Sequence, residues 1–599
     1  MTILARKAVF LGTALSVVLS LATVGARPAQ AATNAVPAQF IAKMYSEVLG
    51  RSPDASGWAS EISYFSGGSN CTQAGLKSRG RNFYLGTEFS NLGYDNAAKL
   101  LTLYHGVVNS ETDQTSFDSN LASLNSGALT WTQMVDAFFD STYFGNLVNA
   151  ICATTTSNTR ELPDPGAYYY GWDGDGFASA DFNTIDAPNL PLTSGDTGFA
   201  GSVGGKTQED LQTELDNAAS TCGTVYLAQK SVTRIKYVPT DPPTAFIPLT
   251  VPSCVTLTTS NVSTAPPTTA QYALMGRLVR DRPDVAGIGV VLQPGAKMKN
   301  VWYDGRRNDP DNYANSAQST DAGVVLAGGD GTQLVNSRVT NSNGFRAVAA
   351  AGTLFGYSTD CTNHLISGNF VTSYSTRRKE VSGADGAQSG IEIWCKSGTV
   401  SANTVVDATD WGMAIIVFGT SQTATDTPTP SNPNVSVIDG NVVFNAGNSL
   451  YTGIGYSAEG NNPSQILNFK GSSIKNNVLW ASQRAHMTLA FQAGLRAHLG
   501  DVANRVDYPV FQDNQLGLNS SNPLITEQAY SMSAAWNASV TSTVSSWITN
   551  TNTGPNCPVQ VITAAYTTSP APSFGRWSTW LGGTGPTGWV DVETKSCIN

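Results

Sequence analysis

The sequence predicts a mainly β protein, a solenoid of short parallel strands, preceded by a small all-α domain. A fixed repeat period marks a repeat architecture, and short apolar strands between Gly/Asn turns mark a β-solenoid. The repeat is carried by an asparagine, which tolerates turn conformations and whose amide can bond the same amide one coil away. Intervals of 34, 38, 36 and 37 residues separate its five occurrences, Asn369, Asn403, Asn441, Asn477 and Asn514.

The chain opens with the features of an export signal. Arg6 and Lys7 form a basic start, an apolar stretch follows, and Ala29-Gln30-Ala31 forms a small-residue cleavage site. A membrane anchor is the alternative, and it is disfavoured because Gly and Ser interrupt the apolar run. We therefore expect residues 1–31 to be a secretion signal peptide. The protein is then extracellular, with association with the bacterial cell surface as a second expectation.

The net charge of the chain limits the kinds of partner that it can bind. The first 31 residues hold three of the 34 basic residues and no acidic one, so the remainder carries 31 basic against 44 acidic residues, a formal charge of −13. This balance argues against nucleic acid and against insertion into an anionic membrane. Low charge (13%) and 57 glycines are typical of an extracellular all-β protein. The oligomeric state stays open.

The cysteines predict disulfides and no metal. An even number in an exported chain suits disulfide bonds, and no C-x-x-C pair or His/Cys cluster indicates zinc. We expect pairing between nearest neighbours within each region. All eight lie beyond the signal: Cys71, Cys152, Cys222, Cys254, Cys361, Cys395, Cys557 and Cys597.

Residues 36–150 show helical periodicity in two copies, with Tyr45 equivalent to Tyr104. The string L-G-R-S-P-D-A-S-G-W, which ends at Trp58, resembles the bacterial domain-of-unknown-function 4214 family. The resemblance implies a role in surface or glycan attachment. The second copy departs from the family pattern, with Gly106-Val107 where Gly-Arg would stand. A helical spacer without a ligand is the alternative.

A linker rich in Pro, Gly and aromatic residues is expected over residues 151–204. Within it, Asp173-Gly174-Asp175-Gly176 is similar to the start of a calcium loop but lacks the later ligands and the closing Glu. We therefore expect no cofactor and no metal, with calcium as the minor alternative.

The solenoid is expected over residues 205–520. Leu211 and Leu215 lie on one face of a predicted helix that leads into a strand at Thr224 to Leu227. This segment resembles the amino-terminal cap of the pectate-lyase-like right-handed parallel β-helix proteins. The resemblance implies that the asparagines lie between the second and third strands of each coil, and that a site lies on the first sheet. Residues 521–599 are expected to form a carboxy-terminal cap and tail, with residues 524–550 helical.

Two aligned segments indicate where chemistry would occur. Asp385 and Asp407 each lie five residues before an aligned glycine, Gly390 or Gly412, so they should stack about 4.8 Å apart. Two carboxylates this close can supply an acid and a base from one residue type. The alternative is that each aspartate bonds its own backbone in a turn.

A row of polar side chains is predicted on the strand that follows Asp385. Glu392, Trp394 and Lys396 alternate with aliphatic residues and should share the outer face of the first sheet. A carboxylate, an indole and an ammonium group in one row suit sugar recognition, although Trp394 would equally serve to cover an apolar surface. The candidate catalytic residues are Asp385, Glu392, Asp407 and Asp410. The candidate substrate-binding residues are Trp394, Lys396, Trp411, Arg346, Glu459 and His486.

These patterns favour a secreted glycoside hydrolase that degrades an extracellular polysaccharide, because paired carboxylates suit an oxocarbenium-like transition state. The alternatives are a non-catalytic surface protein that binds glycans, and a polysaccharide lyase. The polygalacturonase strings N-T-D, D-D and G-H-G are absent, and the only R-I-K starts at Arg234, in the first coil. The sugar, the linkage and the stereochemistry stay open.

Overall fold

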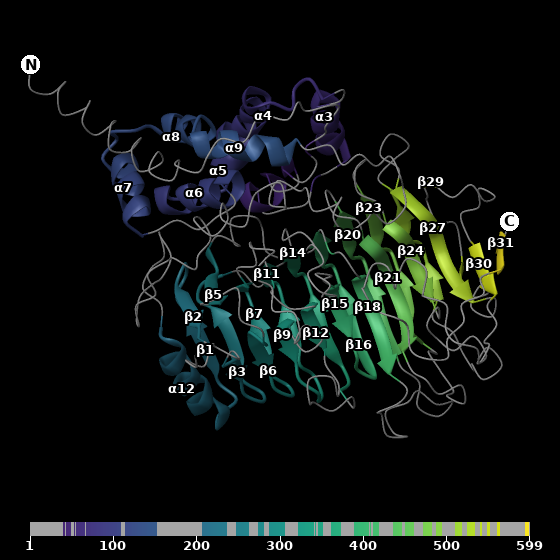
Figure 1. Ribbon diagram of the computed structural model, residues 1–599. Helices are drawn as coiled ribbons and strands as arrows, with labels where there is room; N and C mark the ends of the chain where they lie inside the picture. Colours follow the sequence, from purple (N-terminus) through teal and green to yellow (C-terminus); the bar gives the residue numbers. More distant parts are fainter. Residues whose placement is uncertain are drawn as a thin grey trace, which may run out of the picture.

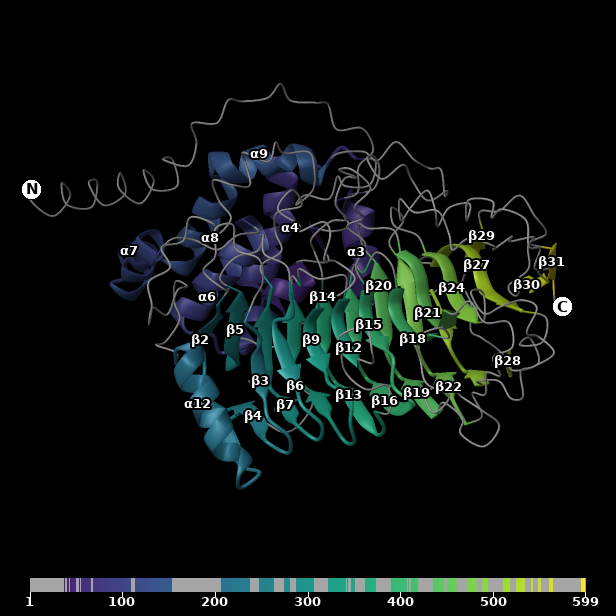
Figure 2. The same ribbon diagram turned by 60° about the horizontal axis from the view of Figure 1, so that its bottom comes forward.

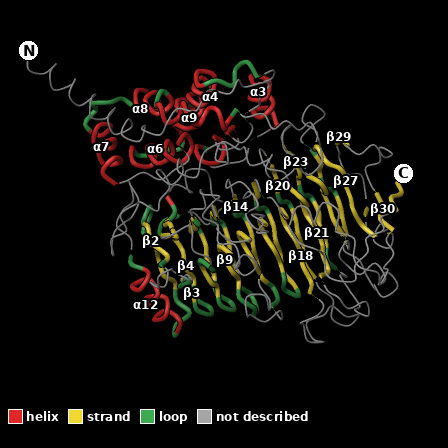
Figure 3. Tube along the Cα trace, viewed as in Figure 1, coloured by secondary structure: helices red, strands yellow, loops and turns green. Residues whose placement is uncertain are grey.

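Three parallel sheets wind into a β-helix, with a helical region lying along one side (Figures 1 and 3). The computed structural model describes most of residues 37–152 and the solenoid from residue 206 onward. The described ranges are 37, 40–41, 44–49, 53, 55–65, 68–108, 114–152, 206–236, 247–262, 274–280, 287–305, 322–340, 342, 346–350, 361–372, 389–406, 408, 411–418, 435–445, 450–459, 471–481, 487–493, 510–517, 524–533, 540–541, 548–550, 560–563 and 594–597.

Each coil contributes one strand to each sheet, and successive coils pair in parallel. The first sheet contains β3 Leu249–Val251, β6 Val290–Leu292, β9 Ala322–Leu326, β12 Arg346–Ala350, β15 Ser389–Ile393, β18 Trp411–Phe418, β21 Leu450–Glu459, β24 Met487–Ala493, β27 Leu524–Ser533, β30 Gln560–Thr563 and β31 Thr594–Cys597, with β29 Ile548–Asn550 beside β27.

The second sheet contains β1 Thr224–Leu227, β4 Thr256–Thr259, β7 Lys297–Lys299, β10 Gln333–Val335, β13 His364–Ser367, β16 Ser397–Ser401, β19 Val435–Asp439, β22 Ser473–Lys475, β25 Val510–Gln512 and β28 Val540–Thr541. The third contains β2 Val232–Ile235, β5 Gly276–Arg280, β8 Val301–Asp304, β11 Arg338–Thr340, β14 Phe370–Thr372, β17 Thr404–Val406, β20 Val442–Asn445, β23 Val478–Ala481 and β26 Gln515–Leu516. The predicted fold class is confirmed.

The predicted asparagine ladder is present in the turn between the second and third sheets. Each amide nitrogen donates to the amide oxygen of the next asparagine at 2.9–3.0 Å, from Asn369 through to Asn514. The same nitrogen donates to a backbone carbonyl, and each receiving oxygen also accepts a backbone N–H. All five residues are at most 1% exposed. Their burial is therefore compensated by hydrogen bonds, and the ladder sets the register of the coils.

The residue before each ladder asparagine has a positive φ. Glycine, asparagine or aspartate occupies the place at Gly368, Gly440, Asn476 and Asp513, but Ala402 adopts φ +55°. A residue with a Cβ atom in the left-handed region destabilises the folded state by about 1–2 kcal/mol. Glycine avoids this strain but lowers the free energy of unfolding by roughly 0.4–1 kcal/mol, because it gives the unfolded chain more conformational freedom.

Replacing Ala402 with glycine is therefore expected to raise the free energy of unfolding by about 0.5–1 kcal/mol, measured by urea denaturation. Ala122→Gly, at an exposed position inside the helix Gln114–Asn125, is the control and should lower it by about 1 kcal/mol, because glycine is unfavourable within a helix. Equal destabilisation by the two changes would contradict the assignment of strain to Ala402.

The interior of the solenoid is built from mostly aliphatic side chains that stack from coil to coil within each sheet. In the second sheet the stack includes Leu334, Ile366, Val400, Ile438 and Ile474, each fully buried. The predicted cap helix, α12 Gln208–Ala219, places Leu211 and Leu215 on this core, and β1 has the predicted bounds. The open end of the first coil is thereby covered.

The expectation that residues 524–550 are helical is wrong. β27 pairs in parallel with β24 of the preceding coil, and β28 and β29 follow. A neighbouring strand with unpaired backbone groups favours extension of the sheet over a local helical pattern. The pairing of the first sheet therefore continues beyond residue 520.

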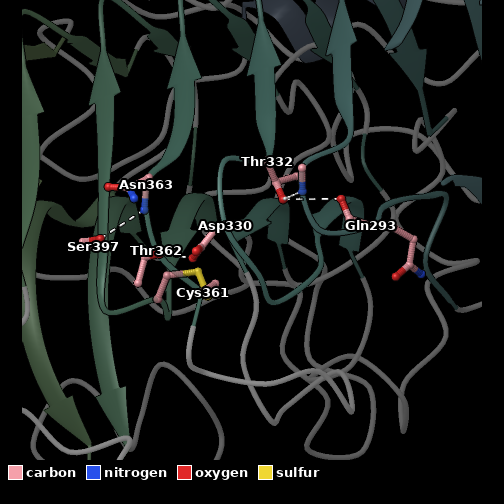
Figure 4. The surroundings of a disulfide bond; sticks show 9 residues. Gln293, Asp330, Thr332, Cys361, Thr362, Asn363 and Ser397 are labelled. Carbon is pink, nitrogen blue, oxygen red and sulfur yellow. Dashed lines mark hydrogen bonds between the residues drawn. A yellow bond between two sulfur atoms is a disulfide. The ribbon is translucent and has the colours of Figure 1, made fainter. Parts of the chain in front are cut away.

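Three disulfides lie in the part of the chain that the structure describes: Cys71–Cys152, Cys222–Cys254 and Cys361–Cys395. They join nearest neighbours, as predicted, while the pairing of Cys557 and Cys597 lies outside the described side chains. Cys361–Cys395 joins consecutive coils at the turn between the first and second sheets (Figure 4). Beside it, the Asn363 backbone N–H donates to Ser397 Oγ at 3.0 Å, and Thr362 Oγ1 bonds Asp330.

The helical region contains η1 Met44–Val48, α3 Ala55–Phe65, α4 Gln73–Leu85, α5 Thr87–Asn91, α6 Asn96–Leu103, η2 Tyr104–Val108, α7 Gln114–Asn125, α8 Trp131–Phe139 and α9 Thr142–Ile151, η denoting a π-helical turn. The two copies use the same edge-to-face ring contact. Tyr45 meets Phe83 and Tyr104 meets Phe138, each at 4.9 Å between ring centroids. The two tyrosines thus have ring partners of the same kind and geometry, while the tandem-repeat organisation of residues 36–150 stays a prediction.

Candidate active site

The outer face of the first sheet carries one buried carboxylate. On β15, Ile391 and Ile393 enter the solenoid core, so Glu392 between them faces outward. Its neighbours in the adjacent coils are Ala349 on β12 and Ala414 on β18. Because both neighbours are alanine, the carboxylate has lateral room for larger partners from other rows.

Arg346 and Trp394 are those partners. Arg346 Nε donates to Glu392 Oε2 in an ion pair, and Trp394 Nε1 donates to the same oxygen at 3.1 Å. The Arg346 guanidinium also lies 5.2 Å from the centroid of the Trp394 ring. The exposed fractions of Arg346, Glu392 and Trp394 are only 5%, 1% and 4%. The three side chains therefore form one buried, charge-assisted network.

Trp411 extends the network on the next coil. Its side chain packs with Trp394 and Ala414 in a buried cluster and is 1% exposed. Its position at the start of β18 depends on Gly412, where a Cβ atom would lie 2.5 Å from the carbonyl oxygen of Gly453. One guanidinium and one indole thus contact the carboxylate, and a second indole packs against the first.

The second carboxylate oxygen of Glu392 is the unusual feature. Among the described residues Oε1 is buried and has no hydrogen-bond partner, unlike Oε2. An unsatisfied buried polar atom costs about 1–3 kcal/mol, more when it is charged. This oxygen is therefore an acceptor site that a hydroxyl group or a water molecule would complete.

The predicted strand alignment is confirmed, because Ile391 pairs with Met413 and Met413 with Ile454. Gly390, Gly412 and Gly453 consequently lie one above another. The predicted stacking of Asp385 and Asp407 stays a prediction, since both lie outside the described residues. Asp410 and His486 also lie outside them, and Glu459 is described only as the backbone end of β21.

Lys396 lies apart from the predicted row. β15 ends at Ile393 and β16 begins at Ser397, so Lys396 belongs to the turn between two sheets. Its backbone N–H donates to the carbonyl of Cys361 at 3.0 Å. The alternation of sides holds only while the strand continues, which is why the pattern fails at this residue.

Sequence reasoning did not single out His364, which faces the solenoid interior on β13 beside the core residue Ile366. Its ring occupies the space above Gly398 in the next coil, where a Cβ atom would come within 1.9 Å of Cε1. Neither ring nitrogen has a well-formed hydrogen bond among the described residues. Burial lowers the pKa of His364 to about 4, and the backbone of Ser397 opposes this shift only in part. The signal available in the sequence was a glycine one coil after a histidine.

Within the described ranges, no three His, Cys, Asp or Glu side chains are grouped so that they could hold a metal ion. The predicted minor alternative, calcium at Asp173–Gly176, lies outside those ranges. No helix in the described part of the chain is long and apolar enough to cross a membrane.

No known protein family matches the chain, and neither does any curated protein. The resemblance of residues 45–58 to the domain-of-unknown-function 4214 family is therefore not shown by a family match.

Several solved β-helix structures are similar to the chain at low identity. A double mutant of the tailspike protein of E. coli bacteriophage HK620, in complex with a pentasaccharide, shares 11% identity and has a TM-score of 0.35. The match covers 59% of this chain and 60% of the tailspike chain, so it leaves about two fifths of that protein unmatched.

Two further matches are an alginate lyase from Paenibacillus sp. (12% identity, TM-score 0.31) and the A-module of the mannuronan C-5 epimerase AlgE6 of Azotobacter vinelandii (11%, 0.26). Each match covers 58% of this chain. The matches cover 96% of the lyase chain and 95% of the epimerase chain, respectively. With TM-scores this low, no activity is transferred from these proteins, and the β-helix assignment depends on the chain's own sheets.

Proposed function

We propose that this protein is a secreted, carbohydrate-active β-helix protein that hydrolyses an extracellular polysaccharide on the outer face of its first sheet. The single observation that supports this function is the Glu392 carboxylate, which is held by Arg346 and Trp394 and keeps one oxygen without a partner. The indoles of Trp394 and Trp411 lie beside this network and are buried with it, so a sugar ring would pack on them only after the site opens.

The role of Glu392 follows from its partners. Both of its partners, a guanidinium and an indole N–H, donate hydrogen bonds to the carboxylate, so Glu392 acts as an acceptor in this network. It therefore suits a nucleophile, a base or a stabiliser of an oxocarbenium-like transition state, rather than a proton donor. The proton donor would come from Asp385, Asp407 or Asp410, which the sequence places near the same junction. A carboxyl separation of about 5–5.5 Å would then give retention, and one of about 6.5–9.5 Å inversion.

A second candidate function is a non-catalytic surface protein that binds glycans. The observation that favours it is the burial of the network of Arg346, Glu392 and Trp394, since Glu392 is only 1% exposed and already engaged in an ion pair. A buried ion pair of this kind also occurs as a purely structural element. A lyase is the third alternative, and it is less favoured because elimination from uronates uses a basic side chain, whereas Arg346 is occupied by Glu392.

The test is incubation of the mature protein with a panel of neutral and acidic polysaccharides. We expect new reducing ends without ultraviolet-absorbing products, because hydrolysis leaves no double bond. Glu209→Gln, on the exposed cap helix, serves as the matched control and should leave the rate unchanged. Unsaturated products would establish a lyase, and retention of a polysaccharide without cleavage would establish the binding protein.

A further inference from the structure

The outer face of the third sheet carries apolar and aromatic side chains, with charged groups among them in the earlier coils, and the helical region packs on it. Side chains of this face share one buried cluster with the helical region. The members from the sheet side are Met275, Trp302, Phe370, Val406, Phe444 and Trp480. Figures 1 and 2 show the helices lying along this side of the solenoid, with α3 beside β20. The two parts of the chain therefore have a common core.

Trp58 on α3 is the anchor of this contact. Its ring meets Phe444 at 5.1 Å and Trp480 at 5.2 Å, both edge-to-face, while Phe444 and Trp480 stack on each other at 3.9 Å. Trp58 is 1% exposed. Aromatic contacts of this geometry contribute about 0.5–1.5 kcal/mol each beyond the burial of area.

An ion pair extends the contact between the helical region and the solenoid toward the first coils. Lys230, in the turn before β2, forms an ion pair with Asp95 of the helical region. On the sheet, Trp302 lies between Arg277 and Arg338, whose guanidinium carbons are 4.3 and 4.4 Å from its ring centroid. Both arginines are buried, and Arg277 is paired with Asp304. Guanidinium groups stacked on an indole in this way would be hydrated if the face were open.

The size of the face makes a cover necessary. Four aromatic side chains of ~150–250 Å² each occur in it, whereas the largest apolar patch of a monomer is usually about 300–600 Å². An uncovered face of this extent would be expected to associate with a second copy of itself.

We propose that the helical region is the permanent cover of the third sheet, and that it forms one cooperative unit with the solenoid instead of a freely moving attachment domain. Trp58, the last residue of the L-G-R-S-P-D-A-S-G-W string, is used for this internal contact. Trp58 is then inaccessible to an external glycan or surface ligand. Deleting residues 36–150 would therefore expose the aromatic face and lead to self-association.

The test uses the full mature chain with a site for a specific protease inserted between residues 153 and 205. The described disulfides all lie on one side or the other of this cut. After cleavage, the two fragments are expected to co-elute on size exclusion at micromolar concentration. Trp58→Ala should raise the dissociation constant between the fragments about 100-fold, as expected for the loss of a buried tryptophan, and release the helical fragment.

Trp131→Ala is the matched control, because the Trp131 ring contacts Tyr84 and Phe89 within the helical region. It should leave the fragments together. Should Trp58→Ala fail to fold, Trp480→Ala tests the same contact from the sheet side and should release the same fragment. Separation of the wild-type fragments after cleavage, or equal release by Trp131→Ala and Trp58→Ala, would overturn the proposal.

Discussion

The free energy of unfolding is expected to fall by about 3 kcal/mol as the pH is lowered from 7 to 4, because of one histidine inside the solenoid. His364 is 2% exposed, and burial lowers its pKa from 6.5 to about 4 in the folded protein. Between these two values the unfolded chain binds a proton that the folded chain does not. The contribution of His364 to the free energy of unfolding is therefore fully present above pH 6.5 and declines as the pH falls toward 4. Below pH 4 this residue causes no further loss.

The measurement is urea denaturation of the wild type and of His364→Phe at several pH values. Phenylalanine keeps a planar ring above Gly398 and removes the titrating group. The difference in unfolding free energy between the two proteins should change by about 1.4 kcal/mol per pH unit within the window. Taking this difference removes the contribution of carboxylates such as Asp136 and Glu209, whose pKa values ion-pair partners lower. Parallel pH profiles for the two proteins would show that His364 is not buried as a neutral base.

The features predictable from the sequence are those that repeat once per coil. The ladder asparagines follow one another at 34 to 38 residues, and each makes the same bonds to the next, so periodicity was sufficient to locate them. The cap helix was predictable for a similar reason, because Leu211 and Leu215 lie on one helical face. In both cases a local pattern and the tertiary contact favour the same structure.

The network around Glu392 could be predicted only in part. Its residues were identified by type and alternation, but the pairing of Arg346 with Glu392 joins positions 46 residues apart. Register places Ala349 43 residues before Glu392 and Ala414 only 22 residues after it. The aligned glycines Gly390 and Gly412 predicted the register of Glu392 with Ala414, but no pattern predicted the register with the preceding strand, on which Arg346 lies. The contact of Trp58 with Phe444 was unpredictable for the same reason, since no local pattern links a helix to a strand almost 400 residues later.

Replacing Glu392 with glutamine is expected to lower the free energy of unfolding by about 3–5 kcal/mol, because it removes the anion that forms a buried ion pair with the Arg346 guanidinium. The matched control is Glu209→Gln, which breaks the exposed ion pair with Lys236 and should cost less than about 1 kcal/mol. Thermal and urea denaturation measure both changes. Equal small losses would contradict the buried ion pair.

The paired change of Arg346 to Met and Glu392 to Leu separates structure from chemistry at this site. It removes both charges together, and a buried ion pair replaced by apolar groups of similar volume is often neutral or more stable by ~1–4 kcal/mol. We therefore expect the double variant to recover most of the stability that Glu392→Gln loses. If Glu392 carries out hydrolysis, the refolded double variant should still produce no reducing ends from a polysaccharide that the wild type cleaves. Full activity in this stable variant would show instead that the ion pair only holds the first sheet together, and would leave catalysis to carboxylates outside the network.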